Sequence, residues 1–306
     1  MTRPWSAERI VTETEAAALI EAQFPELAPV SVHLLGEGFD NMVYRVNDRY
    51  VFRFPRRTVA VSLLERECAL LPEIVGDGLP LAVPVPLFIG RPTDDYAWPF
   101  AGYPFLDGFA ALGITREQRV RSAEPLAEFM AKLHRFPVER AFRLGAPGDL
   151  IGRLEPDGRL AQLTVNRDKA IALGLWSDPH PIDAIVERMR RYEKPAHPPA
   201  LVHGDFHFRN VLVDEEGVLS AVIDWGDLHV GHAAADLAFV YSFLPPEGRS
   251  RFFAVYGETD EATLAYARVR AAHTTMFLLL YGHDLGDERL VGAAQATLRL
   301  VLEDDG

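Results

Sequence analysis

The stretch that most constrains this chain is residues 203–226, which reads HGDFHFRN, a short apolar run, a polar turn and AVIDWG. The turn DEEG lies between two apolar segments, so it predicts a β-hairpin formed by Val211–Val213 and Ser220–Ile223. This hairpin would bring Asn210, which precedes its first strand, beside Asp224, which follows its second strand. Asp205, Asn210 and Asp224 are therefore expected to converge at one end of the hairpin.

The side chains expected at this end of the hairpin carry oxygen ligands of the kind that Mg²⁺ prefers. The spacing Asp-x4-Asn from Asp205 to Asn210 is that of the kinase catalytic loop, in which the Asp accepts the proton of the substrate hydroxyl and the Asn binds a metal ion. Asp224 matches the later metal-binding Asp of kinases. The pattern predicts phosphoryl transfer.

The string HGDFHxxN followed by IDW resembles the aminoglycoside phosphotransferase family, the antibiotic kinases with a protein-kinase-like fold, which include the macrolide phosphotransferases. The resemblance implies that Asp205 is the catalytic base and that Asn210 and Asp224 bind Mg²⁺. It also implies an α+β fold of two lobes with ATP or GTP and Mg²⁺ in the cleft. We expect a β-rich N-lobe over residues 1–103 and a mainly helical C-lobe over residues 104–306.

A second motif, GEGFDNMV, follows a predicted strand over Val30–Leu35. It resembles the kinase glycine loop GxGxxGxV, with Asn in place of the third glycine, and an ordinary β-turn is the alternative interpretation. Glycine allows backbone N–H groups to approach phosphate oxygens closely. The residues expected to contact the nucleotide here are Gly36, Gly38, Asn41 and Val43.

The next predicted strand, Tyr50–Phe54, turns Val51 and Arg53 to one face. Kinases place a phosphate-binding Lys at the position of Arg53 and a small apolar residue over adenine at that of Val51. The chain has no Lys before Lys132, so we expect Arg53 to clamp phosphate through its planar guanidinium.

A predicted helix over Val59–Ile74 supplies the acid that would pair with Arg53. Glu67 is our first choice and Glu65 the second. The resemblance further implies that a hinge segment, in which Tyr103 and Phe105 lie, contacts the nucleotide base.

Several expectations concern the second lobe. Asp236 is expected to support the catalytic loop by hydrogen bonds, and His134 to be a hydrogen-bonded core histidine. The expected helices of this lobe are one long helix over Arg116–Phe136, a helix over Ile182–Tyr192 and two or three helices over 261–302. Residues 145–180 are expected to form an insertion of short helices, which is a candidate region for substrate specificity. The stretch Met276–Tyr281 is expected to be buried, and the alternative is that it forms a binding wall for an apolar antibiotic.

Charge and composition limit the partners. With 31 Lys and Arg against 44 Asp and Glu, the net charge of −13 disfavours nucleic acid and anionic membranes and favours small cationic substrates. The single cysteine, Cys68, excludes an intrachain disulfide and suits a reducing cytoplasm. The first residues lack the apolar core of a signal peptide. We expect a cytoplasmic monomer.

The expected reaction is transfer of the γ-phosphoryl group of ATP or GTP to a hydroxyl group of a small cationic substrate, with an aminoglycoside first. A macrolide is the next candidate, followed by choline or an amino sugar. A pseudokinase that binds nucleotide without turnover is the alternative from a different class, because Arg53 departs from the usual Lys. The sequence leaves open the acceptor, its reacting hydroxyl, the preferred nucleotide and the effect of Arg53.

Overall fold

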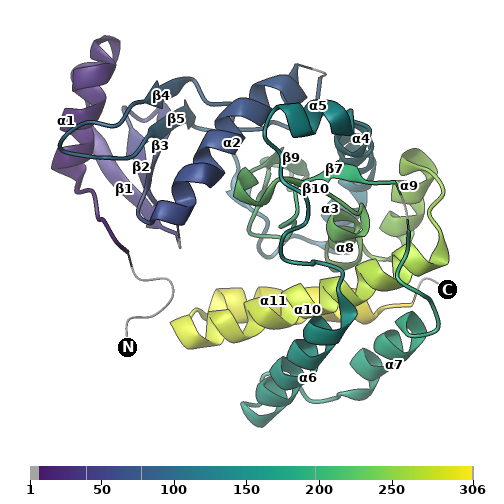
Figure 1. Cartoon of the computed structure of the whole chain (residues 1–306). Coiled ribbons are helices and arrows are strands. Elements are labelled where there is room, and N and C mark those ends of the chain that lie inside the picture. Colours follow the sequence, from purple (N-terminus) through teal and green to yellow (C-terminus); the bar gives the residue numbers. More distant parts are fainter. Residues whose placement is uncertain (1–6, 39, 77, 197, 305–306) are drawn as a thin grey trace.

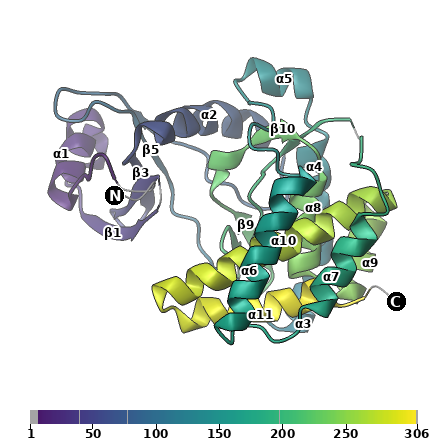
Figure 2. The same cartoon turned by 60° about the horizontal axis from the view of Figure 1, so that its bottom comes forward.

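The structure is a computed structural model that describes residues 7–38, 40–76, 78–196 and 198–304. Residues 1–6, considered above for a signal peptide, and residue 39 of the expected glycine loop lie outside these ranges. A smaller part built on a β-sheet lies beside a larger, mainly helical part (Figures 1 and 2). This arrangement confirms the predicted α+β class.

The N-terminal sheet has five strands in the order β1-β2-β3-β5-β4, and every neighbouring pair is antiparallel. Alternation along β3 gives the sheet two different faces. Phe52 and Phe54 are fully buried in a core shared with the first helix, whereas Arg53 points to the opposite face, toward α2. The strands are β1 (Val32–Glu37), β2 (Asn41–Val46), β3 (Tyr50–Pro55), β4 (Phe88–Gly90) and β5 (Phe100–Pro104).

Helix α2 (Thr58–Val75) lies across the second face of this sheet and also reaches the helical part (Figure 1). Leu64 of α2 packs with Ala101 and Tyr103 of β5. The helix also packs against the short helix η2 (Trp225–Asp227), which directly follows Asp224. Helix α2 therefore connects the sheet to the segment predicted to bind metal.

The chain passes from one part to the other between β5 and β6 (Phe109–Ala110), because β6 already pairs with a strand of the second part. The predicted hairpin is confirmed as β8 (Val211–Val213) and β9 (Leu219–Val222), paired antiparallel. Strands β7 (Ala200–Val202) and β10 (His229–Gly231) form a separate antiparallel pair, one on each side of the hairpin in the sequence.

Helices pack around this hairpin to form the main core. Helix α8 (Ala234–Phe243) is buried along its whole length, because α10 (Glu261–Leu285) and α11 (Glu288–Leu302) cover it. The remaining helices are α1 (Glu13–Gln23), η1 (Pro25–Leu27), α3 (Arg116–Arg121), α4 (Ala123–His134), α5 (Val138–Arg143), α6 (Pro156–Ala172), α7 (His180–Met189) and α9 (Pro246–Tyr256).

The expectation of one continuous helix over Arg116–Phe136 is wrong, because the helix breaks at Ser122. Pro125 lies in the first turn of α4, where its missing N–H removes a hydrogen bond to the preceding turn. The Ser122 hydroxyl donates to the Gln118 carbonyl and accepts from the Leu219 N–H of β9. The break thus ties these helices to the hairpin.

Two further expectations need correction. Within residues 145–180 the structure has a single helix of 17 residues, α6, rather than several short ones. In the apolar stretch Met276–Tyr281, Phe277 is 51% exposed and stacks on Tyr281, while Met276 is fully buried as expected. The two helices α10 and α11 agree with the prediction for residues 261–302.

None of the helices in the described ranges is long and apolar enough to cross a membrane.

Candidate active site

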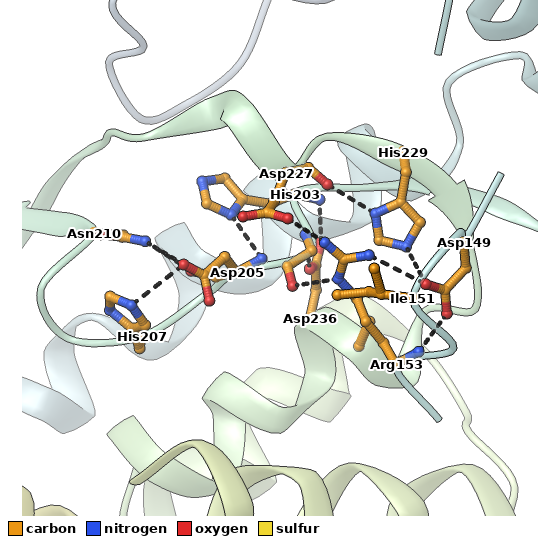
Figure 3. Close-up of polar contacts among 12 residues, drawn as sticks. Asp149, Ile151, Arg153, His203, Asp205, His207, Asn210, Asp227, His229 and Asp236 are labelled. Atoms are coloured by element: carbon orange, nitrogen blue, oxygen red, sulfur yellow. Dashed lines mark hydrogen bonds and ion pairs between the residues drawn. The ribbon is translucent and has the colours of Figure 1, made fainter. Parts of the chain in front are cut away.

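The loop His203–Asn210 leads from β7 into β8 and brings Asp205 beside Asn210 (Figure 3). The Asn210 side-chain amide donates to the Asp205 carbonyl at 2.9 Å and to its Oδ2 at 3.2 Å. The Ile223 N–H donates to the Asn210 carbonyl at 2.9 Å, which fixes Asn210 to the end of β9. The hairpin therefore sets the distance between the Asp205 loop and the segment that carries Asp224.

Asp236 supports the start of this loop from the buried helix α8. Its two carboxylate oxygens accept the backbone N–H groups of His203 and Gly204, each at 2.8 Å. His134 lies 3.2 Å from the same carboxylate and 2.7 Å from the Tyr256 hydroxyl. The expected roles of Asp236 as a hydrogen-bonding support and of His134 as a core histidine agree with these contacts.

Gly204 explains why the motif contains glycine at this position. Its φ of +84° lies in the left-handed region, and a Cβ there would lie 2.6 Å from the Asp227 carbonyl oxygen. Any side chain would therefore be strained and would also clash with backbone. Glycine thus permits the chain to turn tightly between the end of β7 and Asp205.

The Asp205 carboxylate is partly exposed and lies among positive groups. Burial alone would raise its pKa, but a hydrogen bond from His207 and the positive charges of His207, His203 and Arg270 lower the pKa well below the usual range. Nε2 of His207 lies 3.4 Å from Oδ2 of Asp205. The carboxylate is consequently ionised at neutral pH, which is the form that can accept a hydrogen bond from a hydroxyl.

Arg53 connects the two parts of the molecule. Its Nη1 donates to both carboxylate oxygens of Glu67, at 3.0 and 2.9 Å, and its Nη2 donates to Asp224 Oδ1 at 2.9 Å. Glu67 is only 2% exposed, and burial raises its pKa against the opposing effect of the Arg53 charge. The pair expected between Arg53 and Glu67 is present, whereas Glu65, the second choice, is exposed.

Asp224 has an unusual backbone conformation. Its φ of 65° is left-handed, a conformation that costs a residue other than glycine on the order of 1–3 kcal/mol and that is often found at functional sites. Its side chain is 54% exposed at the end of β9. Both amide hydrogens that Asn210 uses point to Asp205, so its Oδ1 is the atom available to a cation. Together Asn210 and Asp224 offer the few oxygen ligands with which a Mg²⁺ bound to phosphates is usually held.

The glycine-containing segment forms the turn between β1 and β2. Gly38 donates its N–H to the Asn41 carbonyl at 2.9 Å, and the register shifts between Leu34 and Gly36. Val43 of β2 pairs directly with Arg53 of β3, so these two side chains share one face of the sheet. The segment thus has the strand–turn–strand form expected of a phosphate-binding loop.

The residues of the hinge differ in how they are placed. Tyr103 pairs with Val51, and its side chain is buried beside Glu67 with its ring 5.8 Å from the Arg53 guanidinium carbon. The ring of Phe105 lies 4.3 Å below the Arg45 guanidinium. The Tyr103 side chain is therefore part of the packing between the sheet and α2.

Two charged residues that contact the loop carrying Asp205 were not predicted from the sequence, namely Arg153 and Arg270. Arg153 contacts Asp149 and Asp227, and Arg270 reaches the loop from α10. Asp149 and Arg153 lie in a segment without a recognisable pattern. Arg270, however, lies in the region 261–302 that was predicted to be helical, between Val269 and the apolar pair Ala271-Ala272, and a charge among apolar residues is a signal that could have identified it.

The Asp205 carboxylate beside Asn210, together with the Arg53–Glu67 pair that reaches Asp224, corresponds to the groups of a kinase-type phosphotransferase site. The family model described as "Phosphotransferase enzyme family" matches residues 31–272, and the chain belongs to this family. The match includes the hairpin, the loop and the first half of α10.

Individual relatives agree with this assignment. Viomycin phosphotransferase of Streptomyces vinaceus is 27% identical over 257 residues, which cover 79% of this chain and 84% of that protein. The GDP complex of wild-type aminoglycoside 2'-phosphotransferase-IIIa superposes with a TM-score of 0.69 and 26% identity over 95% of this chain and 98% of its own. Macrolide 2'-phosphotransferase type I shares the fold, with a TM-score of 0.58 and 22% identity over 95% of this chain and 98% of its own.

Proposed function

We propose that this phosphotransferase moves the γ-phosphoryl group of ATP or GTP, with Mg²⁺, to a hydroxyl group of a small cationic antibiotic, and that it does so as a cytoplasmic monomer. The observation that carries the proposal is the joint placement of Asp205, Asn210 and Asp224, with Arg53 bridging Glu67 and Asp224. These groups supply a base, oxygen ligands and a cation, which are the parts that phosphoryl transfer requires.

In this proposal Asp205 orients the acceptor hydroxyl and receives its proton. A carboxylate with a lowered pKa is a weak base, so its main contribution is orientation. Orientation of the hydroxyl is sufficient because the transition state of phosphoryl transfer is loose. The hydroxyl therefore does not have to lose its proton before its bond to phosphorus forms. Asn210 and Asp224 would hold Mg²⁺, which neutralises charge on the phosphates when it is bound.

The nucleotide would lie between residues 1–103 and residues 104–306, the two lobes in this proposal. Arg53, held by Glu67, would contact phosphate oxygens, and its planar guanidinium suits two oxygens at once. The turn between β1 and β2 would cover the phosphates. Residues assigned to nucleotide contact are Gly36, Gly38, Asn41, Val43, Val51, Arg53, Glu67, Tyr103 and Phe105, the last two near the base.

Charge on the second lobe supports a cationic acceptor. From Leu201 onward the chain has 7 Arg and 17 Asp and Glu. Three of these arginines, Arg249, Arg268 and Arg270, are buried, so the surface is more acidic than the composition suggests. A relative named for viomycin and a neighbour named for aminoglycosides fit an antibiotic acceptor. We therefore place an aminoglycoside-type polyamine first.

A macrolide is the second candidate, and one observation favours it. Phe277 and Tyr281 form a parallel stack with centroids 6.3 Å apart, and Phe277 is exposed. The exposed Phe277 ring, stacked on the half-buried Tyr281, offers apolar surface that a polyamine does not need.

Expression in a susceptible host tests the proposal. Strains carrying the unmodified protein and the Asp205→Asn variant would be compared across aminoglycosides, viomycin and macrolides. Resistance to a cationic member that Asp205→Asn abolishes is the expected result. Resistance to macrolides alone would select the second candidate, and identical susceptibility of both strains to every compound would contradict an antibiotic acceptor.

A further inference from the structure

Two arginines meet at one backbone carbonyl directly before Asp205. Arg153 Nε donates to the Gly204 carbonyl oxygen at 3.0 Å, and Arg270 Nη2 donates to the same oxygen at 2.8 Å (Figure 3 shows the Arg153 side). A carbonyl oxygen has two lone pairs, so these two bonds use its full capacity. The oxygen belongs to the peptide unit that joins Gly204 to Asp205.

The two guanidinium groups come from distant parts of the chain. Arg270 lies on α10 and also donates to the Ala235 carbonyl at 3.1 Å, while Arg153 lies in the segment that precedes α6. Arg153 is tied down further by Asp149, at 3.1 Å from its Nη1, and by Asp227. Both arginines are buried, at 6% exposure for Arg153 and 9% for Arg270.

Burying two like charges side by side is costly, and burial lowers the pKa of Arg270 to about 10. Apolar residues of similar volume would often stabilise such a core better than buried charges do. The cost is therefore a reason to look for a function at the atom that both groups contact. That atom controls the orientation of the peptide from which the Asp205 side chain extends.

The backbone N–H groups of the same turn are also hydrogen-bonded. Asp236 accepts the N–H groups of His203 and Gly204, and the Asp205 N–H lies 3.3 Å from Nδ1 of His203. Because Gly204 has no side chain and a φ of +84°, the turn has little intrinsic preference for this shape. External hydrogen bonds must define the direction in which Asp205 leaves it.

We propose that Arg153 and Arg270 are positioning residues that clamp the Gly204 carbonyl and thereby aim the Asp205 carboxylate at the acceptor hydroxyl. Through its bonds to the Gly204 carbonyl and to Asp227, Arg153 also couples the segment before α6 to the loop that carries Asp205 and to η2. The inference rests on the proposed function, since it assigns these residues to the same phosphoryl transfer.

The test compares Arg270→Met with Arg268→Met as a matched control. Arg268 lies on the same helix, is equally buried and donates to the Val301 and Glu303 carbonyls, far along the chain from Asp205. Loss of one charge-assisted hydrogen bond corresponds to a decrease of roughly 10- to 100-fold, which we expect in kcat for Arg270→Met with the KM for nucleotide unchanged. Arg268→Met is expected to lower Tm and leave kcat within about twofold of the unmodified protein.

Two further variants strengthen the test. Arg270→Lys keeps a positive charge that can reach one carbonyl, so it should recover part of the lost kcat. Arg153→Met should also lower kcat, and the double variant Arg153→Met/Arg270→Met should cost less than the product of the two single effects, because both side chains act on one oxygen. If Arg270→Met does not fold, Arg270→Lys and Arg153→Met carry the same comparison.

Hydrogen exchange provides a readout that does not depend on activity. Arg270→Met should speed amide exchange over residues 203–207 relative to Arg268→Met. The proposal is overturned if folded Arg270→Met and Arg153→Met retain the unmodified kcat, or if exchange in this segment does not change. If the unmodified protein transfers no phosphoryl group, the proposed function fails, and the exchange result alone then decides whether the clamp exists.

Discussion

Replacement of Arg53 by Ala is the most informative single change at this site, because Arg53 touches both Glu67 and Asp224. Each charge-assisted hydrogen bond contributes about 1.5–3 kcal/mol, so loss of a phosphate contact should lower kcat/KM by roughly one to two decades. The same change leaves the Glu67 carboxylate buried without its cation, which should cost about 3–5 kcal/mol of stability. That is a large part of the about 5–15 kcal/mol that holds a protein folded.

The two effects can be separated. The double variant Arg53→Met/Glu67→Met removes both buried charges, so it should recover most of the stability lost in Arg53→Ala while kcat/KM stays low. Arg53→Lys should retain part of the activity, since it keeps one charge near Glu67 but loses the second nitrogen, which bonds to Asp224 at the same time. Arg9→Ala, which removes an ion pair to Glu15 with both side chains about 40% exposed, serves as a surface control and should cost no more than about 1 kcal/mol.

The assays are urea unfolding for stability and steady-state phosphoryl transfer for kcat/KM. If Arg53→Ala has normal kinetics, the guanidinium does not clamp phosphate. The interpretation as a pseudokinase would then gain weight. If the double variant is both stable and fully active, the pair is structural only.

Three further changes have defined outcomes. Asp224→Asn should keep the fold, because Asn tolerates a left-handed backbone. It should abolish the Mg²⁺ dependence of nucleotide binding measured by calorimetry. Unchanged Mg²⁺ dependence would show that Asp224 is not a metal ligand. Gly204→Ala should lower Tm and turnover, since its Cβ would lie 2.6 Å from the Asp227 carbonyl oxygen, and normal values for both would refute the strain argument. Asp236→Asn should be less stable than the unmodified protein at pH 7. Burial alone would raise the pKa of Asp236, but hydrogen bonds from His134 and the loop outweigh burial and lower it. The stabilisation by the Asp236 carboxylate is therefore present above about pH 4 and is lost as the pH falls through the folded-state pKa. Urea unfolding should show the gap between the two proteins narrowing in acid, and a gap independent of pH would contradict this reasoning.

Local patterns in the sequence were sufficient to predict the elements that carry the motifs. The turn DEEG and its apolar flanks define the hairpin, and alternation along Tyr50–Phe54 correctly separates Arg53 from the buried Phe52 and Phe54. The helical spacing between Glu67 and the apolar residues of α2 places this acid on the face that meets β3. The contact between Arg53 and Glu67 could therefore be predicted from strand and helix periodicity once the strand had been recognised as kinase-like.

Contacts that depend on packing between distant segments were not predictable in this way. The clamp on Gly204 joins residues separated by 51 and 66 positions, and no periodic pattern links Arg153 or Arg270 to the loop. The contact between Arg53 and Asp224 spans 171 positions, and it depends on how α2 packs against η2. The break at Ser122 had a local signal in Pro125, which the long apolar pattern around it outweighed.

Phosphoryl transfer by the purified protein is the direct test of the proposed activity. The protein would be incubated with Mg²⁺ and either ATP or GTP and a panel of hydroxylated polyamines and macrolides, beside Asp205→Asn, and the acceptors would be analysed by mass spectrometry. We expect a gain of one phosphoryl group on a cationic acceptor and a turnover at least about 10²-fold lower for Asp205→Asn, with nucleotide binding retained. Near-normal turnover by Asp205→Asn, or nucleotide binding without transfer to any acceptor, would contradict the proposed activity.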